Sequence, residues 1–508
     1  MTKKRAIIIG SGYGGIALAN ILGKAGYKVD VYEKNEAVGG RLSAFPQDGF
    51  TFDIGPSWYL MPEVFEQYYG LFGASATKRL DIQRLSPGYK IFFENEDPVI
   101  IEGSLKADAR TFESIERGAG KKLRQYVSRS SFIYTISTQR FLYTNFTNVF
   151  KLIDWTILKK APYLLYMALE TLDRYVSKSF VDRRLKQILE YHMVFLGSSP
   201  FQAPAIYSLM SHLDFNTGVF YPRRGMMSLV DDLVALGAPY DITYHTDSPI
   251  KKIVVEHEKA VGVKLGNSNV ERADVVVSNA DLHHTETSLL SPAHRSYSKR
   301  YWEKRQAGPS SLVISLGIKG KLPQLLHHNL YFVDEWRDNF RSIYETMAIP
   351  EHASIYICNP TKTDPSLAPK GHENLFILVP LPSGVKLTER ALSSLTSRII
   401  ATTSRIIDAP DLPSRIVSQR VFGPEDFKTR YNAWEYNAFG GQSHLLQQSV
   451  IFRTPNVSKK VKNLYYVGAG TLPGIGLPMC LMSAHLTYKR IAGIKDEGPL
   501  MAIEEMSE

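Results

Sequence analysis

Three glycines near the start of the chain constrain its fold more than any other feature. Gly10, Gly12 and Gly15 have the G-x-G-x-x-G spacing; they follow a β-branched run over residues 6–9 and open an apolar helical pattern over residues 14–24. The first glycine turns the chain, the second lets the backbone approach a pyrophosphate, and the third allows close packing of helix on strand. The helix N-terminus offers N–H groups and a positive dipole end to phosphates. The stretch predicts a dinucleotide-binding unit.

The residues that follow the three glycines indicate which dinucleotide the unit binds. A second strand is expected over residues 28–32, and Glu33 follows it, about twenty residues after the glycines, where an acid binds ribose hydroxyl groups. NAD and FAD share this unit. Gly39 and Gly40 allow a second backbone approach to the pyrophosphate, and Arg41 can neutralise it. This E-x(5)-G-G-R continuation resembles the FAD-binding signature of amine-oxidase-like flavoproteins.

Four further segments extend the resemblance across almost the whole chain. Residues 49–57 (GFTFDIGPS), 221–226 (YPRRGM), 273–281 (ADVVVSNAD) and 463–478 (NLYYVGAGTLPGIGLP) are similar to motifs of the bacterial and fungal type of phytoene desaturase. The second segment departs from the family's Y-P-x-G-G-M, because Arg224 stands in place of the first paired glycine. This substitution bears on the geometry of that turn.

The resemblance implies FAD as the cofactor. It places the N-terminus of a helix expected over residues 482–491 against the flavin ring, where a positive dipole end stabilises negative charge. It also implies an adenine contact through the backbone near Ile250. The cofactor-binding residues that we predict are Gly10, Gly12, Gly14, Gly15, Glu33, Lys34, Gly40, Arg41, Ile250, Gly468, Gly470, Gly476, Pro478 and Met479.

The activity implied by the resemblance is desaturation of a long polyene such as phytoene in carotenoid biosynthesis. A hydride passes from an allylic carbon to flavin N5, a proton leaves the neighbouring carbon, and oxygen or a quinone is the expected electron acceptor. Because the conjugated chain delocalises the developing positive charge, the pattern names no catalytic side chain. Asp173, Asp182 and Glu190 lie in the helical region, where we expect solvated surface carboxylates.

Two alternatives stay open. One is a relative with different chemistry: a carotenoid isomerase, saturase or end-group oxidase. The other belongs to another class, a prenyl-lipid escort protein that keeps the fold without redox work.

The predicted fold is α/β, with a discontinuous Rossmann-like FAD-binding domain, a mixed α+β substrate domain and a helical membrane-associating part. The C-terminal tail is expected to be frayed. The predicted division is 1–105, 215–290 and 440–495 for the FAD-binding domain, 106–214 for the helical region, 291–439 for the substrate domain and 496–508 for the tail.

Charge and aromatic residues point to a membrane surface as a partner. The net charge is +10, and the apolar runs fall well short of the ~20 residues that span a bilayer. We therefore expect a monotopic protein, peripheral on the cytoplasmic face, with an interfacial segment between Arg117 and Glu170. Core-facing helices with a solvated outer side are the alternative. No nucleic-acid fold signature accompanies the basic residues. The expected anchor residues are Phe146, Phe150, Trp155 and Tyr163.

Cysteine and histidine usage predicts neither a disulfide framework nor a metal site. Only Cys358 and Cys480 occur, far apart in the sequence, which suits a reducing cytoplasm. The pairs His283–His284 and His327–His328 lack the spacing of metal motifs, so surface or loop positions are expected. The basic start followed by a glycine-broken apolar run does not predict a signal peptide.

Overall fold

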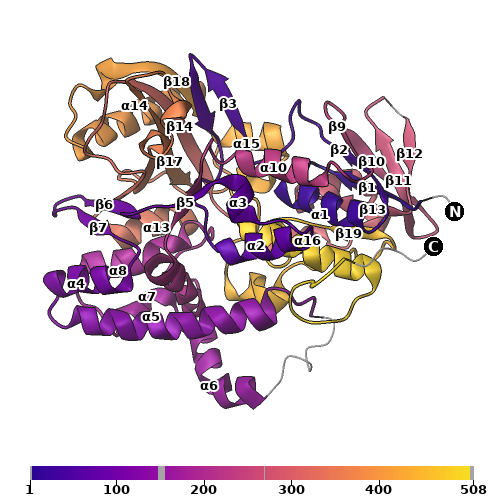
Figure 1. Cartoon of the computed structure of the whole chain (residues 1–508), viewed down its shortest axis with the longest axis horizontal. Helices are drawn as coiled ribbons and strands as arrows, with labels where there is room; N and C mark the ends of the chain where they lie inside the picture. Colours follow the sequence, from indigo (N-terminus) through magenta and orange to yellow (C-terminus); the bar gives the residue numbers. More distant parts are fainter. Residues whose placement is uncertain (1–2, 147–154, 268, 504–508) are drawn as a thin grey trace.

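A five-stranded parallel sheet forms the nucleotide-binding half of the molecule. The computed structural model describes residues 3–146, 155–267 and 269–503. The strand order is β19-β13-β1-β2-β9, so strands from distant parts of the chain lie side by side (Figure 1). Their bounds are β1 Arg5–Ile9, β2 Lys28–Tyr32, β9 Ile242–His245, β13 Val275–Ser278 and β19 Leu464–Tyr466. The expected Rossmann-like α/β fold is confirmed.

The two faces of this sheet are buried by different layers, which explains the continuous apolar run of β1. Ala6 and Ile8 belong to the core that includes α1, whereas Ile7 and Ile9 pack with a second, three-stranded sheet. Burial on both faces is typical of parallel strands in α/β folds. The covering elements are α1 Tyr13–Lys24, α10 Ser228–Gly237, α16 Leu477–Ala492, and the antiparallel strands β10 Ile250–Glu256, β11 Lys259–Leu265 and β12 Val270–Arg272.

A seven-stranded sheet forms the second half, in the order β18-β14-β17-β16-β15-β6-β7. The positions of strands β6 and β7 differ from the domain division expected from the sequence. They lie within the piece 1–105 assigned to the FAD-binding domain, yet β6 pairs in parallel with β15 of this sheet. The bounds are β6 Tyr89–Phe93, β7 Val99–Ile101, β14 Ser310–Lys319, β15 His328–Phe332, β16 Ile355–Cys358, β17 His372–Leu381 and β18 Ile416–Phe422, with α14 Glu389–Ile406 and α13 Trp336–Tyr344 beside them.

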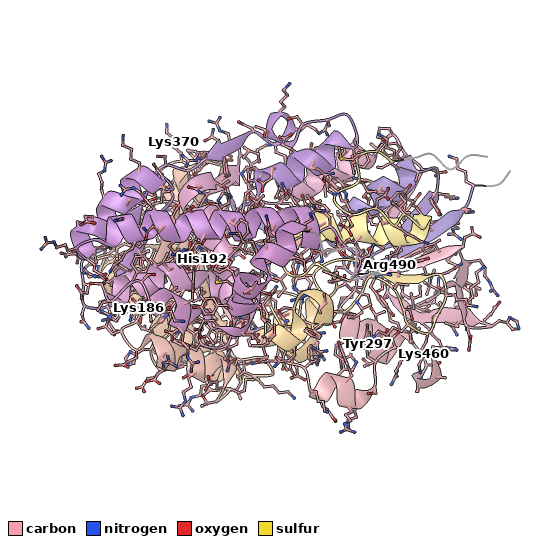
Figure 2. The ribbon with its side chains drawn as sticks, turned by 90° about the horizontal axis from the view of Figure 1, so that it is seen from below. Lys186, His192, Tyr297, Lys370, Lys460 and Arg490 are labelled. Atoms are coloured by element: carbon pink, nitrogen blue, oxygen red, sulfur yellow. The ribbon has the colours of Figure 1, made fainter. Side chains whose placement is uncertain are left out.

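Helices make the lower layer, and α6 projects from it (Figure 1). Seen from below, the helical side with Lys186 and the loop with Lys460 lie at opposite ends of the molecule (Figure 2). No helix within the described residues is both long and apolar enough to cross a bilayer. The bounds are α4 Leu105–Ile115, α5 Ala119–Ile136, the π-helical turn η1 Ser137–Phe141, α6 Trp155–Leu169, α7 Leu172–Ser177 and α8 Arg183–Glu190.

Short elements connect these layers. Strands β3 and β4 pair with each other, as do β5 and β8. The remaining bounds are β3 Ala44–Gln47, β4 Phe50–Asp53, α2 Pro62–Gly70, α3 Ala76–Leu80, β5 Ile82–Arg84, α9 Met210–His212, β8 Phe220–Pro222, α11 Leu282–His284, α12 Lys299–Glu303 and α15 Pro424–Tyr431.

The C-terminal tail is ordered over its described part, which corrects the expectation of fraying. Lys489 of α16 donates to the carbonyl groups of Asp496 and Gly498. Leu500 and Ile503 are buried against the main core. Two apolar side chains inside the acidic tail therefore anchor it.

Candidate functional site

One cavity of about 560 Å³ runs from the nucleotide sheet into the helical layer. Its volume lies in the range of small-molecule and cofactor sites. Twelve of the fourteen residues predicted to bind the cofactor line this cavity. The other two, Gly15 and Gly468, are not among its lining residues. The lining residues of the predicted set are Gly10, Gly12, Gly14, Glu33, Lys34, Gly40, Arg41, Ile250, Gly470, Gly476, Pro478 and Met479.

The glycine motifs meet around one side chain, Asn279. A Cβ atom on Gly12 would lie 2.6 Å from Asn279 Oδ1, and one on Gly468 would lie 2.5 Å from Asn279 Nδ2. A Cβ on Gly15 would lie 2.5 Å from the carbonyl oxygen of Gly10. Gly468 and Gly15 therefore allow close packing behind the cavity wall and do not line the cavity themselves. Three motifs that are far apart in the sequence thus build one cradle of exposed backbone.

Two helix N-termini open onto this cradle. Gly12 is the N-cap of α1 and Gly476 is the N-cap of α16, and neither helix has a side-chain cap. The two helices pack against each other. Uncapped N–H groups and two positive dipole ends at one cavity suit the anionic and electron-accepting parts of a dinucleotide. The residues present therefore fit FAD.

Glu33 provides a fixed carboxylate at the nucleotide end of the cavity. It is 5% exposed, its Oε2 atom accepts from the main-chain N–H of Ser11, and its Oε1 atom accepts from the main-chain N–H of Asn35. These bonds hold the carboxylate at the end of β2. This is the position from which an acid binds ribose hydroxyl groups.

The positive charges at this end are held by carbonyl groups. The buried Arg41 guanidinium donates to the carbonyl oxygens of Ala438 (2.9 Å) and Asn437 (3.0 Å), and it stacks over the Tyr431 ring at 5.1 Å. Burial lowers the pKa of Arg41 from its usual value. Lys34 is tied in the same way, to the carbonyl oxygen of Thr429. Neither cation forms an ion pair with a carboxylate among the described residues.

The other end of the cavity is uncharged. All the Asp, Glu, Lys and Arg side chains in its described lining (Glu33, Lys34, Arg41, Asp281 and Arg430) belong to the nucleotide end. Apolar and aromatic residues, with a few hydroxyl groups, line the remainder. Examples from separate elements are Ile54, Trp58, Phe141, Leu142, Phe195, Leu209, Val313, Tyr356, Phe376 and Leu378. Such a wall suits an apolar substrate.

One imidazole faces this apolar end. His444 lines the cavity, and its Nδ1 atom lies against the carbonyl oxygen of Leu196, so Nδ1 carries the hydrogen and Nε2 carries the lone pair. A Cβ on Gly474 would lie 3.2 Å from His444 Nε2. Burial and the Arg453 guanidinium hold the pKa of His444 well below its usual range. The sequence analysis did not identify this residue, which lies outside the quoted motifs.

The turn at Arg224 keeps its geometry despite the missing glycine. Arg224 has φ 71°, in the left-handed region, and its main-chain N–H donates to Asp364 Oδ2 at 2.6 Å. Gly225 follows with φ 83°. The carboxylate bond therefore offsets the strain that a side chain adds there.

Several expectations for polar residues outside the motifs are wrong. Glu190 is 1% exposed and accepts from the Trp336 indole at 2.8 Å, and burial raises its pKa to about 8. Asp182, which caps the start of α8, and Asp173, which pairs with Arg337 at 3.2 Å, are partly exposed. His327 and His328 are also buried rather than exposed, because both lie where β15 packs inside the molecule.

The aromatic segment divides between core and surface. Tyr143 is buried, and Tyr163 packs against the main core with its hydroxyl group buried, so Tyr163 does not match the anchor role expected for it. Phe146 lines the cavity. Phe150 lies outside the described residues, and Trp155 is described only as the first residue of α6.

Known proteins resemble the chain over nearly its whole length. The sequence profile of the family "Flavin containing amine oxidoreductase" matches residues 13–491. A carotenoid 3,4-desaturase of Haloarcula japonica is 38% identical over 484 residues, covering 95% of this chain and 97% of the relative. A zeta-carotene-forming phytoene desaturase of Myxococcus xanthus is 31% identical over 96% of this chain and 94% of the relative.

Solved structures share the fold. Cyclohexylamine oxidase of Brevibacterium oxydans superposes with a TM-score of 0.59 at 12% identity, covering 97% of this chain and 99% of that one. Putrescine oxidase gives a TM-score of 0.63 at 13% identity over 97% of this chain and 99% of that one. These likenesses show the fold, and the sequence matches show that the chain belongs to the flavin-containing amine oxidoreductases, in the carotenoid desaturase family of FAD-dependent enzymes.

Proposed function

We propose that the protein desaturates a long carotenoid polyene. The observation that carries the proposal is the two-part cavity, whose nucleotide end holds every charged side chain of its described lining while the other end is apolar. A hydrocarbon chain gains by leaving water for such a wall at roughly 25 cal/mol per Å² of apolar surface. When bound, FAD would supply a hydride acceptor in this cavity.

The chain's own residues exclude water and orient the polyene. Trp58, Phe195 and Phe376 enclose the apolar part of the cavity. Loss of a hydride leaves a delocalised positive charge on the substrate, which makes the neighbouring C–H group strongly acidic. A weak base therefore suffices to remove the proton. We assign this role to Nε2 of His444, because its lone pair is fixed by the Leu196 bond.

A variant tests this assignment. His444→Asn is expected to lower turnover about tenfold to a hundredfold, near the lower limit of general-base effects, while FAD stays bound. Turnover equal to that of the unaltered protein would exclude His444 as the proton acceptor.

The substrate class is tested by pigment formation. The chain is expressed in cells that accumulate phytoene and, separately, in cells that accumulate a coloured carotenoid with saturated bonds left at its ends, because its two relatives above are named for different desaturations. New, longer-wavelength absorbing products in either strain support desaturation and identify the preferred substrate. Unchanged pigments in both strains would contradict the proposal.

We also propose that the protein lies peripherally on the cytoplasmic face of a membrane and passes its electrons to oxygen or a quinone. The support is α6, on which Leu158, Leu165 and Leu169 are exposed by 50%, 60% and 66%. Lys159 and Lys160 are exposed beside them. An apolar helical face next to cations suits an anionic lipid surface. Phe141 and Phe146, which precede α6 in the chain, line the cavity.

A further inference from the structure

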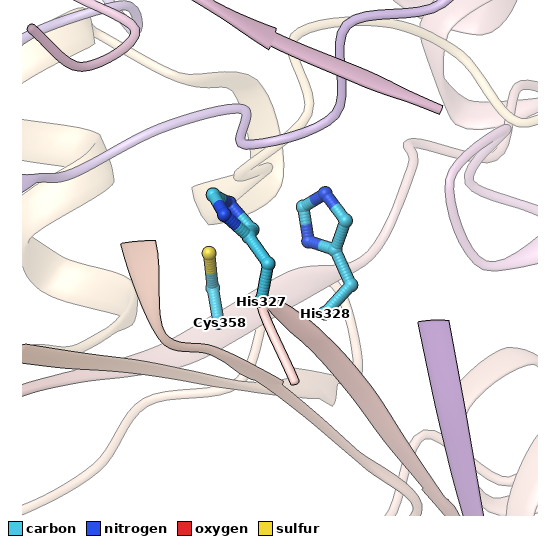
Figure 3. A group of neighbouring side chains, drawn as sticks. All are labelled: His327, His328 and Cys358. Carbon is cyan, nitrogen blue, oxygen red and sulfur yellow. The ribbon is translucent and has the colours of Figure 1, made fainter. Parts of the chain in front are cut away.

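A buried cluster of three metal-binding residue types lies behind the apolar wall of the cavity. His328 and Cys358 face each other across the antiparallel ladder of β15 and β16, and His327 directly precedes β15. One nitrogen or sulfur atom from each of the three side chains lies within 4.8 Å of the others. Figure 3 shows all three side chains on the same side of the strands.

The imidazoles are oriented as metal ligands are. His328 Nδ1 lies 2.7 Å from the hydroxyl oxygen of Tyr356, and Tyr356 donates its own hydrogen to Ser57 at 3.0 Å. His328 therefore donates from Nδ1 and carries its lone pair on Nε2. His327 Nδ1 is likewise held by Thr363 Oγ1, at 2.6 Å. Metal-bound histidines are usually supported at the second ring nitrogen by a carboxylate, a carbonyl oxygen or a water, and hydroxyl groups take that place here.

The two remaining imidazole nitrogens are buried and have no partner. Neither His327 Nε2 nor His328 Nε2 has a hydrogen-bond partner among the described residues, although the side chains are only 5% and 0% exposed. A buried polar atom without a partner costs about 1–3 kcal/mol. An ion coordinated at either nitrogen would remove that cost for it.

Charge and enclosure favour a divalent ion. Trp58 stacks on the His328 ring at 4.3 Å, and Tyr221 meets the His327 ring edge-on at 4.3 Å, so aromatic rings enclose the buried cluster. The Asp53 carboxylate accepts from Tyr221, whose ring meets His327. A divalent cation suits these surroundings, because a Cys358 thiolate bound to it would neutralise part of its charge.

We propose that His327, His328 and Cys358 bind one Zn²⁺ ion. Two imidazoles and a thiolate are ligands that zinc accepts, and the thiol proton is released to solvent as the Zn–S bond forms. The ion ties the start of β15 to the end of β16 directly behind Trp58 and Tyr356, which line the cavity. Its role is therefore to fix the wall against which the polyene lies. The site does not depend on the proposed substrate.

The test is metal analysis of the tag-free, FAD-loaded protein. The unaltered protein, incubated with Zn²⁺ and desalted, is expected to retain one zinc per chain. Cys358→Ala is expected to retain at least tenfold less, whereas Cys480→Ala, the matched change at the chain's other cysteine, retains the full amount. Thr363→Val, which removes only the support of His327, is expected to weaken zinc binding about 10- to 100-fold.

Cobalt substitution gives a second readout that does not need a variant. Co²⁺ added to the unaltered protein is expected to produce a thiolate-to-cobalt charge-transfer band in the difference spectrum. Absence of that band, together with zinc retention no higher than in Cys358→Ala, would overturn the proposal. Equal zinc retention in the unaltered protein and in Cys358→Ala would also overturn it, because the metal would then be bound elsewhere.

Discussion

The main-chain N–H and the hydroxyl group of Ser11 both donate to the same carboxylate oxygen, Oε2 of Glu33, at 2.9 and 3.0 Å. Ser11 lies inside the glycine motif and Glu33 ends the next strand, so this contact joins the two halves of the nucleotide-binding unit. Asn35 donates to the other oxygen from its main-chain and side-chain nitrogens. The carboxylate is therefore positioned by the protein.

Glu33→Gln removes the charge and places an amide opposite these donors. Charge-assisted hydrogen bonds contribute about 1.5–3 kcal/mol, so FAD affinity is expected to fall roughly ten- to a hundredfold. Fluorescence titration of the apoprotein with FAD measures the change. Asp30→Asn on the same strand is the control, because Asp30 pairs with Arg5 and His245 away from the cavity. Equal affinity in Glu33→Gln and the unaltered protein would refute this role for Glu33.

Alanine substitutions at Gly40 and Gly73 form a matched pair that tests the backbone cradle around Asn279. Both have left-handed φ angles, 62° and 69°, so alanine adds about 1–2 kcal/mol of strain at either position. A Cβ on Gly40 would lie 3.0 Å from Gly12 Cα, whereas one on Gly73 meets nothing within 4 Å. Both variants are expected to be less stable than the unaltered protein. Only Gly40→Ala is expected to lose bound FAD as well. Retention of FAD in Gly40→Ala would contradict the cradle.

Glu190 makes stability depend on pH. Its folded-state pKa is raised from 4.5 to about 8, so the folded protein binds more protons than the unfolded chain between these values. Its contribution to the unfolding free energy is therefore fully present below pH 4.5 and is lost as the pH rises toward 8. Glu190→Gln removes this dependence. Relative to the unaltered protein, the variant is expected to gain about 1–3 kcal/mol between pH 5 and pH 8.

Urea unfolding at several pH values measures this gain. Glu303→Gln is the control, because its exposed pair with Lys299 contributes less than about 1 kcal/mol. A stability difference between Glu190→Gln and the unaltered protein that is the same at pH 5 and pH 8 would show that Glu190 does not titrate in this range.

Exposed leucines on α6 test the membrane proposal. Changing Leu158, Leu165 and Leu169 together to serine is expected to lower partitioning into anionic vesicles at least tenfold, which corresponds to about 1.4 kcal/mol. High salt is expected to weaken binding of the unaltered protein without abolishing it, because the apolar contribution survives screening.

The matched control changes three exposed apolar residues elsewhere, Val270, Met347 and Val417, to serine. Vesicle sedimentation and FAD absorbance are read for both triple variants. If the α6 variant sediments as fully as this control, α6 is not the contact with lipid.

The local motifs were predictable because their geometry is set by neighbours in the sequence. Strand β2 has the expected bounds, and α1 begins at Tyr13, one residue before the expectation. Gly12 and Glu33 line one cavity, since a βαβ unit determines their relation within about twenty residues.

Features that depend on long-range pairing were not predictable. Strand β6 joins the second sheet through the register of Lys90 with Asn329, which no local pattern indicates. His328 and Cys358 meet across a ladder between separate strands, so the spacing of the histidine pair carried no signal. Glu190 ends a charged helix whose local composition suggests exposure, and only the packing of Trp336 buries it.

Anaerobic mixing of the FAD-loaded protein with vesicles that contain the preferred carotenoid tests the central claim most directly. Desaturation predicts loss of the oxidised-flavin absorbance together with a red shift of the polyene spectrum, in a one-to-one ratio. A carotenoid isomer formed without loss of flavin absorbance, or carotenoid bound with neither change, would contradict desaturation.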